Sequence, residues 1–325
     1  MKIIITGATG SLGSALTRHF STCGHEVIAT GKTNTPPKGL LEAAQYLVTD
    51  ITRPYSLPDA DVCIHTAALS DDKGRPGDLY NANVTGTLHT LKAAGNCKKF
   101  IHISSSSVYL PSNSPLTEDM AGRQNNRKLS PYGYSKLLTE QMLIENNTAK
   151  SCFVLRPRAL YGAYDKVILP RLLKLVKNNS IQKPGSLEVK VSMTHYDNLS
   201  HAIECCIASE KTGINIYNVA DDKVYTLIDV IRKFTRAIYE SNLPEKKVPV
   251  AFLKILALFR LNGITPLLVR TFTNDMVLDI SRIKKELSYN PSMELSSSLD
   301  KLGKWVESIG GAEVLKTGDK SLAWK

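Results

Sequence analysis

The sequence has few cysteines, few aromatic residues and no long hydrophobic run. Its six cysteines form no Cys-x-x-Cys pair, which argues against a zinc pattern and a disulfide framework and favours buried free thiols. None of the seven histidines stands in a recognised metal-ligand spacing, so we expect no metal. The chain also opens without a signal-peptide pattern, and we expect a cytoplasmic protein.

The chain is long enough for one large α/β domain, or for a large domain with a smaller one, because 325 residues exceed the usual single core. The formal net charge is +11, yet Lys and Arg are spread along the chain without an aromatic-interleaved patch. Nucleic acid is therefore not expected as a partner. A small-molecule substrate is expected instead, and a homodimer is compatible with the sequence.

Short runs rich in β-branched residues alternate with helical patterns in the first half of the chain. Apolar residues recur at helical spacing after the first run and before the fifth. This alternation predicts right-handed βαβ units and a doubly wound parallel sheet. We expect strands at Ile3–Thr6, Glu26–Thr30, Tyr46–Thr49, Val62–His65, Phe100–Ser104 and Cys152–Arg156, and later helices at Ile168–Val176, Leu199–Ala208 and Leu227–Tyr239.

Three glycines, Gly7, Gly10 and Gly13, separate the first strand from the first helix in a G-x-x-G-x-x-G spacing. Glycine permits a tight turn and lets the backbone approach a pyrophosphate, whose charge then meets the N–H groups and positive dipole at the helix start. In this strand-to-helix context the pattern predicts a dinucleotide site. Taken alone, a simple tight turn would explain it as well.

A carboxylate is missing where an NAD-selecting site expects one, at the end of the second strand. No Asp or Glu occurs from Ala29 to Leu41, while Lys32 and Lys38 could meet a 2′-phosphate. NADP is therefore the expected cofactor, with NAD as the alternative. Solvated surface lysines are the simpler interpretation of these two residues.

Tyr132 and Lys136 are four residues apart, on the same face of a helix expected to begin at Ser130 and Pro131. A fixed positive charge stabilises a phenolate and lowers the pKa of the tyrosine, so Tyr132 could give or take a proton. Tyr134 is an internal control, because the residue four positions after it is not a cation.

A serine run, Ser104 to Ser107, follows the fifth strand. It is expected at the carboxyl edge of the sheet, where doubly wound folds bind ligands. A hydroxyl at this edge can donate a hydrogen bond to a substrate oxygen as charge develops on it. A polar turn is the alternative interpretation of the run.

With these motifs in this order, the chain resembles the extended short-chain dehydrogenase/reductase family of nicotinamide-dependent epimerases, dehydratases and hydroxysteroid-type dehydrogenases. The resemblance extends over nearly the whole chain. It implies a catalytic Ser105, an acid/base Tyr132, and a Lys136 that lowers the pKa of Tyr132 and binds the nicotinamide ribose. Together with Lys32, the predicted cofactor-binding residues are Gly7, Thr9, Gly10, Ser11, Leu12, Gly13, Asp50, Ile51, Ala67, Ala68, Tyr132, Lys136, Pro157 and Ala159.

Because the alternation of strands and helices weakens beyond Gly162, we expect an NAD(P)-binding Rossmann domain over residues 1–162, with later strands from about 189–220. A smaller, mostly helical substrate-binding lobe over 163–325 would be interleaved with its last elements. Val248–Val269 is apolar but too interrupted to span a bilayer. It could line an apolar substrate tunnel or touch a membrane surface, although two packed helices are the favoured interpretation.

Arg158 stands where sugar-nucleotide members commonly carry an asparagine, and the Arg-Pro-Arg form is more similar to hydroxysteroid and 3-oxoacyl-type reductases. We therefore expect an oxidoreductase that transfers a hydride between a nicotinamide cofactor and a hydroxyl or carbonyl of an apolar, steroid-like or 3-oxoacyl-like substrate. One alternative is a nucleotide-sugar epimerase or dehydratase with a permanently bound cofactor. Another is a non-catalytic NADP-sensing protein.

Overall fold

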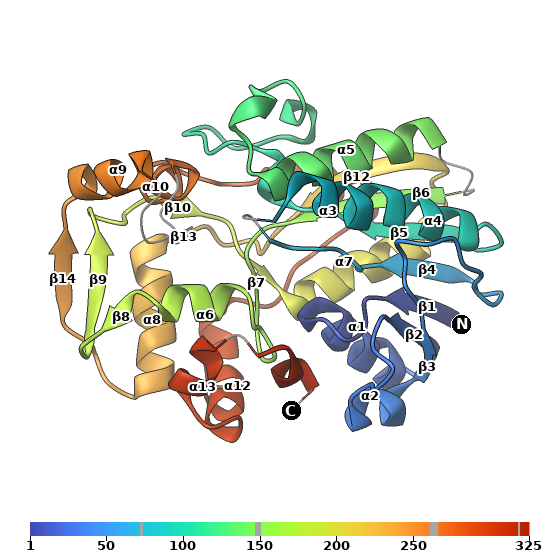
Figure 1. Ribbon diagram of the computed structural model, residues 1–325, viewed down its shortest axis with the longest axis horizontal. Coiled ribbons are helices and arrows are strands. Elements are labelled where there is room, and N and C mark those ends of the chain that lie inside the picture. Colours follow the sequence, from blue (N-terminus) through green and yellow to red (C-terminus); the bar gives the residue numbers. More distant parts are fainter. Residues whose placement is uncertain (72–73, 147–150, 260–265, 318, 325) are drawn as a thin grey trace.

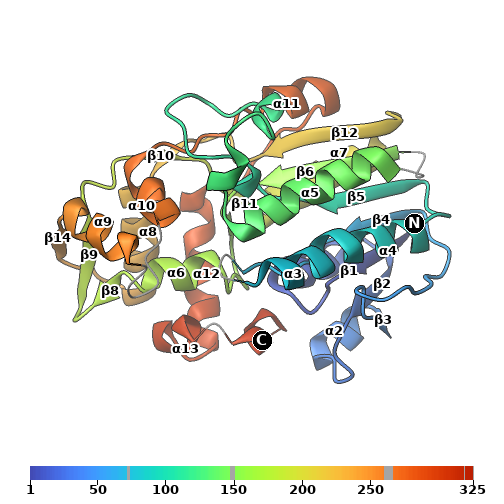
Figure 2. The same ribbon diagram turned by 45° about the horizontal axis from the view of Figure 1, so that its top comes forward.

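A seven-stranded parallel sheet forms the centre of the larger lobe (Figures 1 and 2). The computed structural model describes residues 1–71, 74–146, 151–259, 266–317 and 319–324. The spatial order is β12-β6-β5-β4-β1-β2-β3, so the order in which strands are added to the sheet reverses between β1 and β4. This is the doubly wound Rossmann arrangement, which binds ligands at the carboxyl ends of the strands beside that reversal. The strands are β1 (Lys2–Thr6), β2 (Glu26–Gly31), β3 (Gln45–Val48), β4 (Val62–His65), β5 (Lys99–Ile103), β6 (Ser151–Pro157) and β12 (Gly213–Val219).

All six strands expected from the sequence are present in this sheet, with ends that shift by one residue at most. Within residues 189–220 only β12 joins it. The short strands β10 (Lys190–Val191) and β11 (Thr194–His195) pair instead with β13 (Tyr225–Thr226) and β7 (Leu160–Tyr161). The division into lobes at residue 162 remains a prediction.

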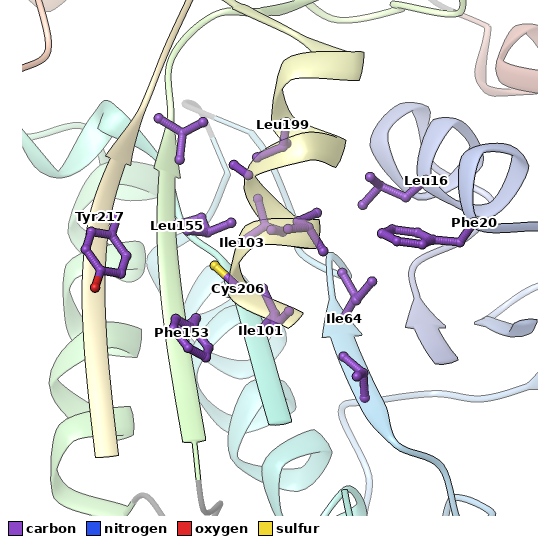
Figure 3. Close-up of a cluster of buried hydrophobic side chains, with 14 of the residues drawn as sticks. Leu16, Phe20, Ile64, Ile101, Ile103, Phe153, Leu155, Leu199, Cys206 and Tyr217 are labelled. Atoms are coloured by element: carbon purple, nitrogen blue, oxygen red, sulfur yellow. The ribbon is translucent and has the colours of Figure 1, made fainter. Parts of the chain in front are cut away.

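Alternating strand residues bury the two faces of the sheet under different helices. Ile3 and Ile5 of β1 face the core beneath α1 (Ser11–Thr22) and α7 (Tyr196–Ala208), as Figure 3 shows for their neighbours Leu16 and Leu199. Ile4 belongs to the opposite core, under α4 (Gly86–Ala93) and α5 (Pro131–Asn146). The other helices of this lobe are α2 (Lys38–Ala43), α3 (Pro76–Leu79) and α11 (Ser281–Leu287). Burial on both faces explains why these strands are apolar runs without alternation.

The smaller lobe combines helices with a three-stranded sheet, β14-β9-β8 (Figure 1). The expected helix Ile168–Val176 ends three residues early, and this boundary was wrong. Asn178 and Asn179 both adopt positive φ, which a two-residue hairpin turn requires, so Val176 starts a strand instead. The elements are α6 (Ile168–Leu173), β8 (Val176–Lys177), β9 (Ser180–Pro184), α8 (Leu227–Tyr239), β14 (Glu245–Val248), α12 (Leu295–Ser308) and α13 (Ala312–Lys316).

The apolar segment Val248–Val269 contains α9 (Val250–Leu258) and the start of α10 (Pro266–Thr273), while residues 260–265 lie outside the described part. Leu253 and Ala257 of α9 pack against Val269 of α10. Helix packing, the favoured interpretation of this segment, therefore accounts for its buried side chains. Phe252, by contrast, is 54% exposed. None of the helices in the described part of the chain combines the length and the hydrophobicity that a bilayer crossing requires.

Candidate active site

In the glycine turn between β1 and α1, Gly7 and Gly13 pack too closely against the backbone to carry a side chain. Gly7 has φ +71°, and a Cβ added to it would lie 2.7 Å from Cα of Ala67 at the end of β4. A Cβ on Gly13 would lie only 2.2 Å from the Gly7 carbonyl oxygen. The backbone of the turn therefore packs directly against the end of β4.

The start of α1 presents backbone donors beside this turn. Gly10 is the N-cap and no side chain caps the helix. The Ser14 N–H, bonded to the Gly10 carbonyl over 2.9 Å, makes the first intrahelical bond, so the amides of Ser11, Leu12 and Gly13 precede it. Such a helix start stabilises an anion, and the predicted diphosphate residues form a cradle of the kind that a dinucleotide requires.

Lys32, just past β2, is held by an acid from the following segment. Its Nζ lies 3.1 Å from Asp50 Oδ2, although the lysine side chain is 78% exposed. The Thr52 hydroxyl and then Lys32 lower the pKa of Asp50 to about 2. Lys38 lies 3.6 Å from Glu42. The end of β2 thus carries no carboxylate of its own, but the neighbouring segment brings one to Lys32.

The predicted floor of the cofactor site combines backbone with small side chains. The Ala67 N–H donates to Thr6 Oγ1 over 3.2 Å, and Ala68 is exposed beyond it. Ile51 packs closely against Gly86, because a Cβ added to Gly86 would lie 2.8 Å from the Cδ1 atom of Ile51. Asn83 is 1% exposed and bridges the Leu69 backbone to the Ser135 hydroxyl, and these contacts are consistent with a structural role for this residue.

Lys136 connects α5 to the end of β5. Its side chain is 2% exposed and its Nζ donates to the Ile103 carbonyl oxygen over 2.9 Å. Burial lowers its pKa to about 8, although the nearby Glu140 raises it. Two residues after Ile103, Ser105 caps the 3₁₀ turn η2 (Ser106–Val108), where its Oγ accepts the Ser107 N–H over 3.1 Å. The lysine and the serine turn therefore meet at one strand end.

Because residue 133 is a glycine, the first turn of α5 packs closely against the serine turn, Ser105 to Val108. A Cβ at this position would lie 2.1 Å from the Ser107 carbonyl oxygen, and the Gly133 N–H donates to Ser130 Oγ over 3.0 Å. The predicted helix start at Ser130 and Pro131 is confirmed. Tyr132, half-buried, precedes this glycine, whereas Tyr134 is 45% exposed. The contact brings the Tyr132 turn of the helix against the Ser105 turn.

A buried ion pair behind this group was not expected from the sequence. Arg156 of β6 donates from Nε and Nη2 to the two carboxylate oxygens of Glu140, over 3.0 and 2.6 Å. Ser104 Oγ also donates to Glu140, and Arg156 Nη1 donates to Tyr109 Oη over 2.6 Å. Burial alone would lower the pKa of Arg156, but Glu140 outweighs it and the pKa is raised. The i+4 spacing of Lys136 and Glu140 on α5 indicates only that these two side chains share a helix face, and no local pattern indicates Arg156 as the partner of Glu140.

Two buried histidines lie near the same lysine. The rings of His65 and His102 stack with centroids 5.4 Å apart. Burial, and then the Lys136 charge, lower the pKa of His65 to about 3 and that of His102 well below its usual value. Both are therefore neutral at physiological pH and add no charge beside Lys136.

The end of β6 places Pro157, and then Arg158 and Ala159, at the carboxyl edge of the sheet. Ala159 has φ +44°, and the Arg158 N–H donates to Thr194 Oγ1 over 3.1 Å. Burial lowers the pKa of Arg158 to about 10, its Nε is enclosed without a hydrogen-bond partner, and no acid of the described residues forms an ion pair with it. A guanidinium in this condition is a candidate receptor for a ligand anion.

Two contacts of the glycine turn come from distant segments that sequence analysis did not indicate. Lys166 Nζ donates to the Thr9 carbonyl oxygen over 3.4 Å. Trp324 Nε1, in the C-terminal turn η6 (Lys320–Trp324), donates to the Ala8 carbonyl oxygen over 3.0 Å. The Arg18 guanidinium lies 4.2 Å from the centre of the Trp324 ring. The C-terminal end of the chain therefore covers one side of α1 (Figure 1).

Comparison with known proteins agrees with this architecture. The model of the NAD dependent epimerase/dehydratase family matches residues 3–220. The chain is 30% identical to the uncharacterized protein YbjS of Escherichia coli, over 95% of this chain and 99% of YbjS. It is 23% identical to a 2-alkyl-3-oxoalkanoate reductase of Stenotrophomonas maltophilia, over 93% and 98% of the two chains.

A third relative is a decarboxylating sterol-4-alpha-carboxylate 3-dehydrogenase of Gibberella zeae, 25% identical over 74% of this chain and 89% of that protein. Among solved structures, the UDP-glucuronic acid 4-epimerase of Bacillus cereus in complex with NAD superposes with a TM-score of 0.75. It is 22% identical and covers 95% of this chain and 99% of the epimerase. At that identity the likeness supports the fold.

Proposed function

Because the chain belongs to the NAD dependent epimerase/dehydratase family of oxidoreductases, we propose that it reduces an apolar ketone that carries an anionic group, or oxidises the corresponding alcohol. Ser105, Tyr132 and Lys136 form the proposed catalytic group. The observation that carries this proposal is the contact of the Gly133 turn with the serine turn, beside the buried Lys136.

A nicotinamide cofactor, when bound, supplies or accepts the hydride. Ser105 donates a hydrogen bond to the substrate oxygen, and Tyr132 gives that oxygen a proton in reduction or removes it in oxidation. Lys136 stabilises the phenolate of Tyr132 by its charge. Glu140, neutralised on its other side by Arg156, favours the charged form of Lys136.

The proposed cofactor cradle is the glycine turn with the start of α1, bordered by Asp50, Ile51, Ala67, Ala68, Pro157 and Ala159. We propose that it prefers NADP(H). The end of β2 lacks the acid that an NAD-selecting site uses, and Asp50 holds Lys32 beside it. Titration of both cofactors tests this preference. The ratio of the two affinities should narrow in Lys32→Ala. It should stay unchanged in the control Lys98→Ala, because Lys98 is also an exposed lysine paired with an aspartate. Equal or tighter NAD(H) binding by the unaltered protein would refute it.

The substrate class rests on Arg158. A guanidinium with a buried, unbonded Nε and no acid partner among the described residues favours a ligand that brings a carboxylate or a phosphate. The names of two relatives, the 2-alkyl-3-oxoalkanoate reductase and the sterol-4-alpha-carboxylate 3-dehydrogenase, both describe apolar carboxylates. We therefore place an apolar 3-oxo or 3-hydroxy carboxylate first.

A nucleotide-sugar epimerase is the second candidate, because the same guanidinium could face a diphosphate and the fold is that of UDP-sugar enzymes. NADPH oxidation with 3-oxoalkanoates of increasing length, and with their methyl esters, separates the two. Each buried CH₂ should raise kcat/KM up to about fourfold until the pocket is full, from about 0.8 kcal/mol of transfer free energy.

The methyl ester should react about tenfold or more slowly than the acid, the loss expected when a charged hydrogen bond is removed. Arg158→Gln should abolish this difference, whereas Arg123→Gln, at an exposed position, should preserve it. Strong competition by UDP or dTDP, with no effect of chain length, would instead assign the protein to the epimerase or dehydratase branch.

A further inference from the structure

Two helices on one face of the sheet bring metal-ligating side chains together, far from the proposed active site. α1 and α7 pack side by side over the core that Figure 3 shows. His19 lies in the last turn of α1 and Cys23 is its C-cap, about 14 Å and about 20 Å along the helix axis from Gly10 at 1.5 Å per residue. Glu204 belongs to α7. The distance separates this cluster from the cofactor cradle.

The ligand atoms of these three residues converge. His19 Nε2 lies 2.6 Å from Glu204 Oε1 and 3.9 Å from Cys23 Sγ. All three ligand atoms lie within 4.8 Å of one another, and within the described part of the chain no other group of three or more potential metal ligands meets this condition. One imidazole nitrogen therefore faces a carboxylate and a thiol at the same time.

A zinc site accounts for the convergence of all three side chains, which a simple ion pair does not. Imidazole, thiolate and carboxylate are zinc ligands, and metal–ligand distances of about 2.0–2.3 Å in a tetrahedron put the ligand atoms about 3.3–3.8 Å apart. The 3.9 Å between His19 Nε2 and Cys23 Sγ is close to this range, and the 2.6 Å between His19 Nε2 and Glu204 Oε1 would lengthen when an ion replaces their direct contact. An ion pair between His19 and Glu204 uses two of the three groups and leaves the thiol aside.

The surroundings favour a cation and orient the carboxylate. Cys23 is the C-cap of α1, where the carbonyl ends of the helix stabilise positive charge. On the other side, His201 Nδ1 lies 3.6 Å from Glu204 Oε2, and the His201 ring stacks on Tyr289 at 5.7 Å. A fixed partner on the second carboxylate oxygen is a common feature of metal sites.

We propose that His19, Cys23 and Glu204 bind one Zn²⁺ ion, with water in the fourth position, and that the ion fastens α1 to α7. This departs from the expectation of no metal, which considered spacings between histidines and not the i,i+4 pair of a histidine with a cysteine. The proposal does not depend on the proposed function, because the site lies at the other end of α1.

The test uses full-length protein without a histidine tag, reduced and treated with a chelator. Titration with Co²⁺ should saturate at one ion per chain and produce a thiolate-to-cobalt charge-transfer band in the near ultraviolet. Cys23→Ser should lose this band, whereas Cys205→Ser, at a half-buried thiol of α7, should keep it. Circular dichroism of each variant verifies that it is folded.

Calorimetric titration with Zn²⁺ supplies the second measurement. His19→Gln should weaken zinc binding by about tenfold or more, since even outer-shell partners are worth that much. His25→Gln, at a half-buried histidine just past the helix, should bind like the unaltered protein. The proposal is overturned if Co²⁺ does not saturate at one ion per chain, if the band survives in Cys23→Ser, or if the two histidine variants bind zinc equally well.

Discussion

Replacement of Lys136 by Met should abolish turnover while making the folded protein more stable. Burial lowers the pKa of this lysine from 10.5 to about 8, so its charge costs about 3 kcal/mol of folding free energy at neutral pH, at about 1.4 kcal/mol per pKa unit. Met retains most of the aliphatic stem but loses the hydrogen bond to the Ile103 carbonyl, worth about 1 kcal/mol. The expected net gain is about 2 kcal/mol.

The pH dependence of this gain follows from the direction of the shift. The pKa of Lys136 is lower in the folded state, so between pH 8 and 10.5 the unfolded chain binds more protons. The contribution of Lys136 to the stability of the unaltered protein therefore rises with pH across this window. The advantage of Lys136→Met should be complete below pH 8 and should shrink towards pH 10.5.

Urea unfolding of both proteins at pH 7 and at pH 10 measures this effect, with turnover recorded on the same preparations. The reasoning would be refuted if Lys136→Met were less stable at pH 7, or if its advantage were equal at the two pH values. Loss of activity without a gain in stability would mean that burial of the charged lysine does not destabilise the folded protein.

Three further substitutions probe the surroundings of the site. Gly133→Ala should lower turnover strongly and cost about 1–3 kcal/mol by overpacking against the serine turn, whereas Gly77→Ala, in open space, should behave like the unaltered protein in the same activity and unfolding assays. His102→Phe should recover part of the roughly 1–3 kcal/mol that a buried polar group without partners costs. Thermal unfolding at pH 5 should show the gain most clearly, because the histidine is protonated in the unfolded chain but resists protonation where it is buried. Arg156→Met should cost about 3–5 kcal/mol in urea unfolding, because it leaves Glu140 buried without its partner.

Local patterns in the sequence were sufficient for most of the sheet and for the start of α5. The strand runs are apolar because both faces of the sheet are covered, and Ser130 with Pro131 is a strong local signal for a helix start. The hairpin at Asn178 and Asn179 was missed, because the helical spacing of the apolar residues continued to Val176, which the structure places in the strand before the turn.

Contacts between distant segments could not be predicted in this way. The acid beside Lys32 comes from Asp50 in the next segment, and the partner of Arg156 comes from a helix sixteen residues earlier in the chain. Nothing local indicates that Trp324 reaches the glycine turn. These contacts depend on how the βαβ units stack, which spacing along the chain does not encode.

The central claim, proton transfer by Tyr132, is tested most directly by comparing Tyr132→Phe with Tyr134→Phe. Turnover is followed by NADPH oxidation with a 3-oxoalkanoate, and cofactor affinity is measured by titration of the same preparations. Tyr132→Phe should lose activity by about a hundredfold or more, the range of general acid catalysis, while it retains cofactor binding. Tyr134→Phe, at an exposed position, should retain both. If Tyr132→Phe retained most of the activity, another group would supply the proton and the assignment of this site would be wrong.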